Sequence, residues 1–210
     1  MCIRDSFYAR VGRAQLPELL FAIDAETHFT RELLGRVPSA PEELIPVYTA
    51  ILVAAMALDS TDVAMMIPGV RLSAIRRASL ILEEERALRR ANDVVISFLL
   101  AQPLSKQWGD GYEASSDLMS LDVSRHVWMA RVDPKRRRHA VGTYTHVLDQ
   151  WGIVYDQPLL LSTRQAGAAI EGTVRQSLTR LERVAVDTHG YTDLGMAVAK
   201  LLGFDLCPRL

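Results

Sequence analysis

The chain has 210 residues, of which 49% are hydrophobic and 23% are charged, and its formal net charge is -1. This length and apolar content can bury one large core or two small ones, so we expect a soluble, globular protein. The small net charge excludes binding to nucleic acid through overall charge, and any such binding must come from local basic patches.

The longest apolar run, 45–58, is interrupted by Thr49 and is shorter than the roughly 20 residues that span a bilayer. It predicts a helix buried on most sides. The two cysteines, Cys2 and Cys207, lie near opposite ends without disulfide or zinc spacing, which fits a reducing cytoplasm. We therefore predict a cytoplasmic protein with no membrane partner.

Both ends of the chain look unnatural. Residues 1–6 show no periodicity and no relation to the segment after them, so we interpret them as a non-native leader. The chain stops directly after an apolar helical segment. We therefore expect a fragment, truncated at its C-terminus.

Helical periodicity dominates the first half of the chain and predicts a helical region over 7–104. Breaks at Pro38, Pro41 and Pro68 separate the helices. Glu83, Glu84 and Glu85 alternate with arginines at helical spacing, so we expect ion pairs on a solvated face rather than a DNA-contacting one. The helices expected after residue 45 cover 46–58, 60–67, 73–82 and 83–100.

After Pro103 the pattern changes to one of strands and turns, which predicts a second region over 105–210. An antiparallel set of strands is followed by a helix, a strand and another helix. This is the order of a ribonuclease-H-like domain, so we predict an α/β fold with a mixed sheet flanked by helices. The expected strands cover 118–123, 126–132, 142–148, 159–161 and 184–186, and the expected helices cover 163–181 and 194–202.

A strongly basic turn joins two of these strands. It contains Lys135, Arg136, Arg137 and Arg138 in succession. Four adjacent cations repel one another, are tolerable in solvent and are useful beside a polyanion. The pattern predicts a hairpin tip that contacts DNA phosphates, and the alternative is a solvated turn.

A candidate metal site lies after the strand 184–186, which ends at Asp187. Ligands gather at the carboxyl ends of strands in open α/β sheets. Two aspartates on neighbouring strands can share divalent ions, and magnesium suits such oxygen ligands. The first-strand partner is Asp117, with Asp110 as its rival. The alternative is that Asp187 is a turn residue and Asp193 a helix N-cap.

Histidine and tryptophan residues give weaker signals. The five histidines have no repeated spacing, so we interpret them as surface or hydrogen-bonded residues and not as zinc ligands. His189 is the exception, because it lies two residues from Asp187 and could orient a DNA phosphate. Trp108, Trp128 and Trp151 lie in apolar neighbourhoods, which favours core packing over base stacking.

Five blocks of sequence resemble the catalytic region of the Tn3 family of replicative transposases. They lie at 108–117 (Trp-Gly-Asp-Gly, then Ser-Ser-Asp), 144–150 (Tyr-Thr-His-Val-Leu-Asp-Gln), 187–193 (Asp-Thr-His-Gly-Tyr-Thr-Asp), 201–204 (Leu-Leu-Gly-Phe) and 208–209 (Pro-Arg). The resemblance implies an RNase-H-like core that nicks transposon ends and joins them to target DNA. It also implies an Asp, Asp, Glu triad with two Mg²⁺ or Mn²⁺ ions, with Asp117 first and Asp187 second.

The chain departs from the family pattern in three ways. Leu118 and Met119 replace the usual Gly and Gln after the first aspartate, which puts the local backbone there in doubt. The family's glutamate lies beyond residue 210, and its preceding DNA-binding domains are missing. We therefore expect the parent to be a DDE transposase of the bacterial nucleoid, homodimeric when full-length, and this fragment to be inactive. The alternative is a non-catalytic DNA-binding or assembly module.

Overall fold

The computed structural model describes residues 14–209. The chain divides into two compact units, one ending at Val95 and the other beginning at Ile96. The division falls inside helix α7 (Glu85–Ala101), several residues before the boundary at 104 that the sequence suggested. Every helix in residues 14–209 is too short or too polar to span a bilayer.

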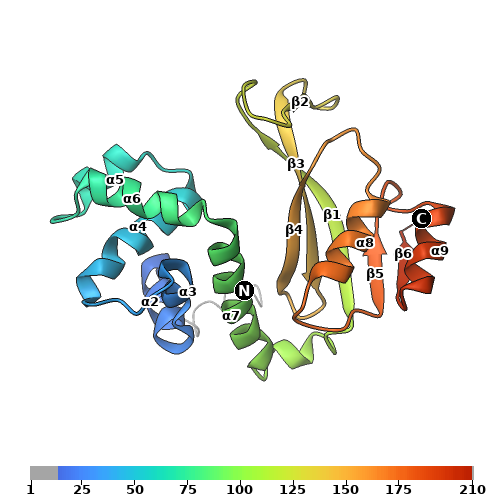
Figure 1. Cartoon of the computed structure of the whole chain (residues 1–210), viewed down its shortest axis with the longest axis horizontal. Helices are drawn as coiled ribbons and strands as arrows, with labels where there is room; N and C mark the ends of the chain where they lie inside the picture. The colour runs from blue at the N-terminus through green and yellow to red at the C-terminus, as the bar shows by residue number, and fades with distance from the viewer. Residues whose placement is uncertain (1–13, 210) are drawn as a thin grey trace, which may run out of the picture. The chain divides into compact units, whose positions relative to one another are not determined.

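The first unit consists of helices (Figure 1). Asp24, which is buried, accepts hydrogen bonds from the Thr30 hydroxyl at 2.7 Å and the Tyr48 hydroxyl at 2.5 Å. A cluster around Phe29, Val47 and Tyr48 forms its core. Besides α7, its elements are α2 (Leu16–Thr27), α3 (Phe29–Leu34), η1 (Pro41–Glu43), α4 (Leu44–Met56), α5 (Ser60–Met66) and α6 (Leu72–Leu82).

The helical unit tests two predictions, the burial of helix α4 and the ion pairs of the glutamates 83–85. Helix α4 is buried only from Val47 to Ala50 and is half-buried or exposed elsewhere. The prediction that it is buried on most sides was wrong. The expected i,i+4 ion pair forms between Glu85 and Arg89, at 3.3 Å.

The second unit contains a six-stranded mixed sheet. Strands β1, β5 and β6 are parallel neighbours, and β3 pairs antiparallel with β1 on one edge and with β4 on the other. The main order is therefore β4-β3-β1-β5-β6, with the short β2 extending beside β3. This is the RNase-H-like arrangement, so the predicted fold class is confirmed. The strands are β1 (Glu113–Asp122), β2 (Arg131–Val132), β3 (His139–Leu148), β4 (Ile153–Leu159), β5 (Arg183–Val186) and β6 (Asp205–Pro208).

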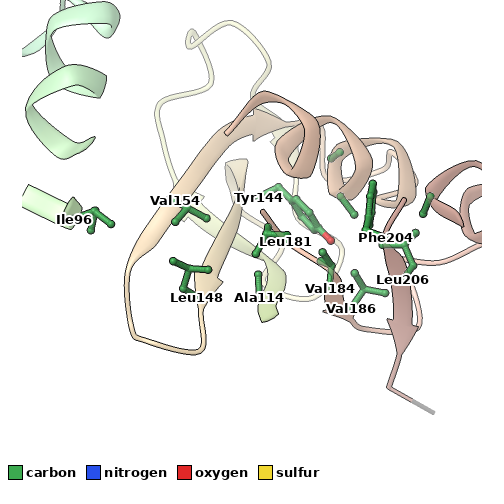
Figure 2. Packing of buried hydrophobic residues seen from close by; sticks show 13 residues of the cluster. Ile96, Ala114, Tyr144, Leu148, Val154, Leu181, Val184, Val186, Phe204 and Leu206 are labelled. Carbon is green, nitrogen blue, oxygen red and sulfur yellow. The ribbon is translucent and has the colours of Figure 1, made fainter. Parts of the chain in front are cut away.

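One face of the sheet carries the core of this unit. Along β3 the side chains alternate, with Tyr144, His146 and Leu148 buried on one face. Helices α8 (Ala166–Arg175) and α9 (Asp193–Leu201) pack against strands and against each other. Figure 2 shows Tyr144, Val184 and Leu206 within this cluster. The other face presents the alternate residues, among them Ser115, Asp117 and Ala185, which are exposed.

Several element boundaries differ from the prediction. The expected strand 126–132 is reduced to β2, because consecutive turns bend the chain between Ser124 and Ala130. The strand expected at 159–161 is instead β4, which ends at Leu159. The expected helix 163–181 ends at Arg175, because the Gln176 side chain accepts hydrogen bonds from the Leu178 and Thr179 amides and stabilises a turn.

The three tryptophans were wrongly predicted to pack in a core. Trp108, Trp128 and Trp151 are 61%, 87% and 65% exposed. Trp108 and Trp151 contact each other edge-to-face, with ring centroids 5.6 Å apart. They line an open groove with Val147 and Ala185, on the sheet face opposite the helices.

Candidate active site

The parallel pairing of β1 with β5 determines where the two candidate aspartates lie. The last paired residues are Ser116 and Val186, so Asp117 and Asp187 are the next residues on neighbouring strands. Ser116 and Val186 are buried on the helix-covered face. Because side chains alternate along a strand, Asp117 and Asp187 both emerge on the opposite, open face.

Asp117 and Asp187 line the same cavity, of about 380 Å³. Its walls come from the middle of β1 and from the carboxyl ends of β5 and β6. In α/β folds, ligands collect at the carboxyl ends of strands. The other lining residues are Ser115, Ser116, Ala185, Val186, Cys207, Pro208 and Arg209.

The turn after β5 holds the Asp187 carboxylate in place. The amide of His189 donates a hydrogen bond to Asp187 Oδ1 at 3.0 Å, and the amide of Gly190 donates to the Asp187 carbonyl at 3.0 Å. A Cβ on Gly190 would lie 2.7 Å from Val186 Cβ, so the turn requires glycine. Asp187 is thus a turn residue as well as a lining residue of the cavity.

Helix α9 begins directly after this turn. Thr192 is its N-cap, and its hydroxyl accepts a hydrogen bond from the Gly195 amide at 3.0 Å. Asp193 is the first helical residue. The alternative that Asp193 is the N-cap is therefore wrong, because the Thr192 hydroxyl already accepts the hydrogen bond of the Gly195 amide in the first turn.

The replacements after Asp117 leave the strand intact. Asp117, Leu118 and Met119 pair in continuous register with Thr145, Tyr144 and Thr143 of β3. Leu118 is partly buried and packs against the core, and its amide donates to Asp117 Oδ1 at 2.7 Å. The unusual residues therefore do not disturb the backbone at the first aspartate.

Tyr144 lies beneath the two aspartates. Its side chain is fully buried, and neither its hydroxyl nor that of nearby Ser116 has a hydrogen-bond partner with normal geometry. Burial raises the pKa of Tyr144 strongly, and the negative charges of Asp187 and Asp117 raise it further. Both carboxylates therefore act on the same buried hydroxyl.

Asp110 does not lie at this site. It precedes β1, and the nearby Tyr112 carbonyl accepts from the Glu182 and Arg183 amides at the amino end of β5. Asp110 is therefore at the opposite end of the parallel strands from Asp187. The structure does not bring this rival together with Asp187.

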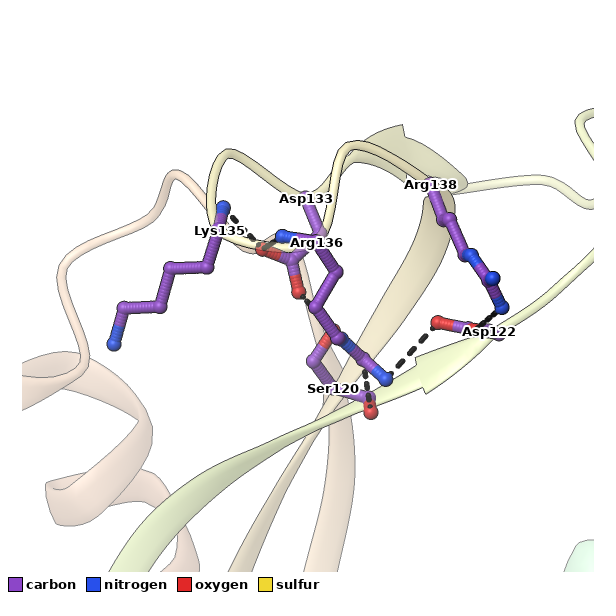
Figure 3. A network of polar contacts seen from close by, with 6 residues as sticks. All are labelled: Ser120, Asp122, Asp133, Lys135, Arg136 and Arg138. Atoms are coloured by element: carbon purple, nitrogen blue, oxygen red, sulfur yellow. Dashed lines mark hydrogen bonds and ion pairs between the residues drawn. The ribbon is translucent and has the colours of Figure 1, made fainter.

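Two of the four cations in the basic turn form ion pairs within the hairpin (Figure 3). Arg136 forms ion pairs with Asp122 at 3.0 Å and with Asp133 at 3.1 Å, and Arg138 pairs with Asp122 at 3.4 Å. Acidic residues of the hairpin therefore pair with these two cations, and the contact of the turn with DNA phosphates stays a prediction. The backbone amides of Lys135 and Arg137 donate hydrogen bonds to Asp133. Neither side chain forms an ion pair within the described structure.

Residues 18–210 match the family model of the Tn3 transposase DDE domain. The chain belongs to this family. It is 44% identical over 208 residues to the transposase for insertion sequence element IS1071 in transposon Tn5271 of Comamonas testosteroni, covering 99% of this chain and 21% of that protein. It is 27% identical to the transposase for transposon Tn1546 of Enterococcus faecium, covering 98% and 21%. The chain therefore spans about a fifth of these relatives.

Among solved structures, the chain is similar to the piggyBac transposase in a synaptic complex with hairpin DNA. The TM-score is 0.46 at 10% identity, and the match covers 87% of this chain and 46% of that one. A match to the Mos1 transposase in a paired-end complex has a TM-score of 0.33 at 13% identity, and it covers 83% and 61%.

The donor set of this DDE domain suits a hard divalent cation. Magnesium is commonly held by one or two carboxylates and keeps several waters, and the two carboxylates that line this cavity are ligands of that type. No cluster of three or more acidic, histidine or cysteine ligands occurs among residues 14–209. Sequence reasoning gave Cys207 and Arg209 no role in this cavity because β6 had not been predicted, although a strand after a βα unit is the expected continuation.

Proposed function

We propose that this chain is part of the catalytic region of a DDE transposase, and that Asp117 and Asp187 bind the catalytic divalent ions. The observation that carries the proposal is the adjacency of these two residues, directly after the last pair of the parallel strands β1 and β5 and within one cavity. Membership of the Tn3 transposase DDE domain family supports it. The parent protein would cleave transposon ends and join them to target DNA.

The two aspartates have distinct surroundings that suit this role. Oδ1 of Asp187 accepts the His189 amide, and Oδ1 of Asp117 accepts the Leu118 amide. Each carboxylate is thereby oriented and keeps Oδ2 for a ligand. Divalent ions such as Mg²⁺ or Mn²⁺ held by these carboxylates would stabilise the attacking and leaving oxygens of a phosphodiester.

We further propose that a third acidic residue, outside these 210 residues, completes the site. The support is that two carboxylates are few for a pair of ions, and that no third ligand joins them in the described part of the chain. On this proposal the chain alone binds metal but neither cuts nor joins DNA. A loss of the third carboxylate removes charge stabilisation that dominates phosphoryl transfer.

DNA contacts are proposed at two places. Lys135 and Arg137 extend from the basic turn, and their cations are available to phosphates of transposon-end or target DNA. His189 is exposed beside Asp187 and could orient a phosphate there. The homodimer expected for the full-length protein belongs to the same proposal.

Metal binding by the chain tests the proposal. Titration with Mn²⁺, followed by electron paramagnetic resonance, should show binding that Asp117→Asn and Asp187→Asn each weaken at least tenfold. Asp110→Asn is the matched control, because it removes the same charge at the other end of the strands, and it should bind as the unaltered chain does. Equal weakening by all three variants would reject the site.

Nuclease activity tests the third carboxylate separately. The chain is incubated with supercoiled plasmid and Mn²⁺, alongside an Asp187→Ala control. We expect no nicking above that control. Nicking that depends on Asp187 would show that the site is complete without a further acidic residue.

A further inference from the structure

The row of residues that contains Asp117 and Asp187 continues onto a third strand. Strand β6 is parallel to β5, and its last pair is Val186 with Pro208. The amide of the next residue, Arg209, donates to the Val186 carbonyl at 2.8 Å. Arg209 therefore stands beside Asp187, as Asp117 does on the other side.

The side chain of Arg209 belongs to the same cavity. Leu206 is buried on the helix-covered face, so alternation directs Cys207 and Arg209 toward the open face, and both line the cavity with the two aspartates. Arg209 is exposed. Its cation therefore lies at the mouth of a site that otherwise carries only negative charge.

Arg209 makes none of the ion pairs found among the described residues, whereas neighbouring cations are paired. Arg183, at the start of β5, pairs with Glu113 of β1, and Lys200 pairs with Asp205 at 2.7 Å. Two carboxylates share the cavity of Arg209, yet neither forms an ion pair with it. The guanidinium is thus available to a ligand.

We propose that Arg209 binds a phosphate of the DNA strand that enters this cavity, an inference that rests on the proposed function. A site with two carboxylates repels a phosphodiester, and a cation at the end of the same row offsets that repulsion. A guanidinium presents two parallel N–H donors to phosphate oxygens, which also fixes the orientation of the phosphate. Arg209 acts by holding the substrate, while the aspartates hold metal.

The test measures DNA affinity and metal affinity on the same variants. Binding of a short fluorescent duplex to the chain is followed by anisotropy in Ca²⁺, at several salt concentrations. Arg209→Gln should weaken binding about tenfold or more, as expected for a lost charge-assisted hydrogen bond. The slope of log affinity against log salt should fall by about 0.9, the value for one phosphate contact.

Two further variants separate a specific contact from a general loss of charge. Arg183→Gln removes one positive charge at the other end of β5 and should leave the affinity and the slope unchanged. Arg209→Lys should keep the slope but recover only part of the affinity, because an ammonium cannot form the paired contact. Wild-type affinity and slope in Arg209→Gln would overturn the proposal, as would equal losses in Arg183→Gln.

The same variants distinguish this inference from the metal site. Arg209→Gln should still bind Mn²⁺, since it supplies no ligand. If the unaltered chain binds DNA through Arg209 but does not bind Mn²⁺, the proposed function fails and the phosphate contact stands. If Mn²⁺ binds through the aspartates and the unaltered chain does not bind DNA, the Arg209 proposal fails alone.

Discussion

The imidazole of His146 packs directly against the backbone of Gly172. Nε2 of His146 lies 3.0 Å from the Ala169 carbonyl, and a Cβ on Gly172 would be 2.2 Å from the ring carbon Cε1. A carbonyl can only accept, so Nε2 carries the proton and Nδ1 is left without a partner. This contact joins strand β3 to helix α8 beneath the candidate site.

Gly172→Ala should therefore destabilise the protein, although alanine normally favours a helix. We expect the free energy of unfolding to fall by about 1–3 kcal/mol, the usual cost of overpacking. Gly167→Ala, in the same helix, is the control, because a Cβ there meets nothing within 4 Å. That variant should be neutral or up to about 1 kcal/mol more stable in urea unfolding. Equal effects at both positions would show that the imidazole moves aside.

The stability of the sheet unit should depend on pH through His146. Burial lowers the pKa of His146, and the hydrogen bond to the Ala169 carbonyl only partly opposes this. The unfolded chain then binds a proton at a higher pH than the folded chain. Stability is therefore fully present above about pH 6.5 and is lost as pH falls toward the folded pKa. Urea unfolding between pH 5 and 8 measures this, and His146→Gln should flatten the profile in that window.

Tyr144→Phe should leave the free energy of unfolding unchanged or raise it by up to about 1 kcal/mol, because the buried hydroxyl has no partner. Tyr48→Phe is the matched comparison. It removes a 2.5 Å hydrogen bond to Asp24 and should destabilise the helical unit by roughly 1–2 kcal/mol. Thermal unfolding followed by circular dichroism compares them. A clear loss of stability in Tyr144→Phe would mean that a water or ligand satisfies the hydroxyl.

We expect some cations of the basic turn to bind DNA and others to stabilise the turn itself. Replacing Lys135 and Arg137 together with Ala should weaken DNA binding and lower the salt slope by up to about 1.8, or 0.9 for each phosphate contact. Arg136→Ala should mainly loosen the turn, because Arg136 holds Asp122 and Asp133. Anisotropy with a duplex measures the first effect, and the rate of trypsin cleavage after Lys135 measures the second. If the salt dependence of DNA binding is unchanged in the double variant, the turn is solvated and does not contact DNA phosphates.

Acid should loosen the same turn. The Ser120 hydroxyl, the Lys135 amide and Arg136 hold the pKa of Asp133 well below its usual range. Folded-state stability from this group is present above the ordinary aspartate pKa of about 3.9 and is lost as pH falls toward the depressed value. Asp133→Asn should mimic acid at neutral pH by increasing protease cleavage of the turn, whereas Asp110→Asn should not. If protease cleaves the turn of Asp133→Asn no faster than that of the unaltered chain, Asp133 does not stabilise the turn.

Local patterns in the sequence predicted most of the helices, strands β3 and β5, and the choice of Asp187. The run 184–186 predicted a strand because its two valines are β-branched and suit a sheet, and the acidic turn after it placed Asp187 at a strand end. The breaks at prolines marked helix ends because proline cannot continue a helix. These signals are local, so a single chain carries them without an alignment.

Tertiary structure alone decided which residues meet. The register of β1 against β5 brings Asp117, rather than Asp110, beside Asp187, and that register depends on pairs about seventy residues apart. Pairing across the hairpin joins Arg136 to Asp122 in an ion pair, which the basic run alone did not indicate. Strand β6 adds Arg209 to the row only because it pairs with β5. Such neighbours are set by strand pairing between distant segments, which no local periodicity encodes.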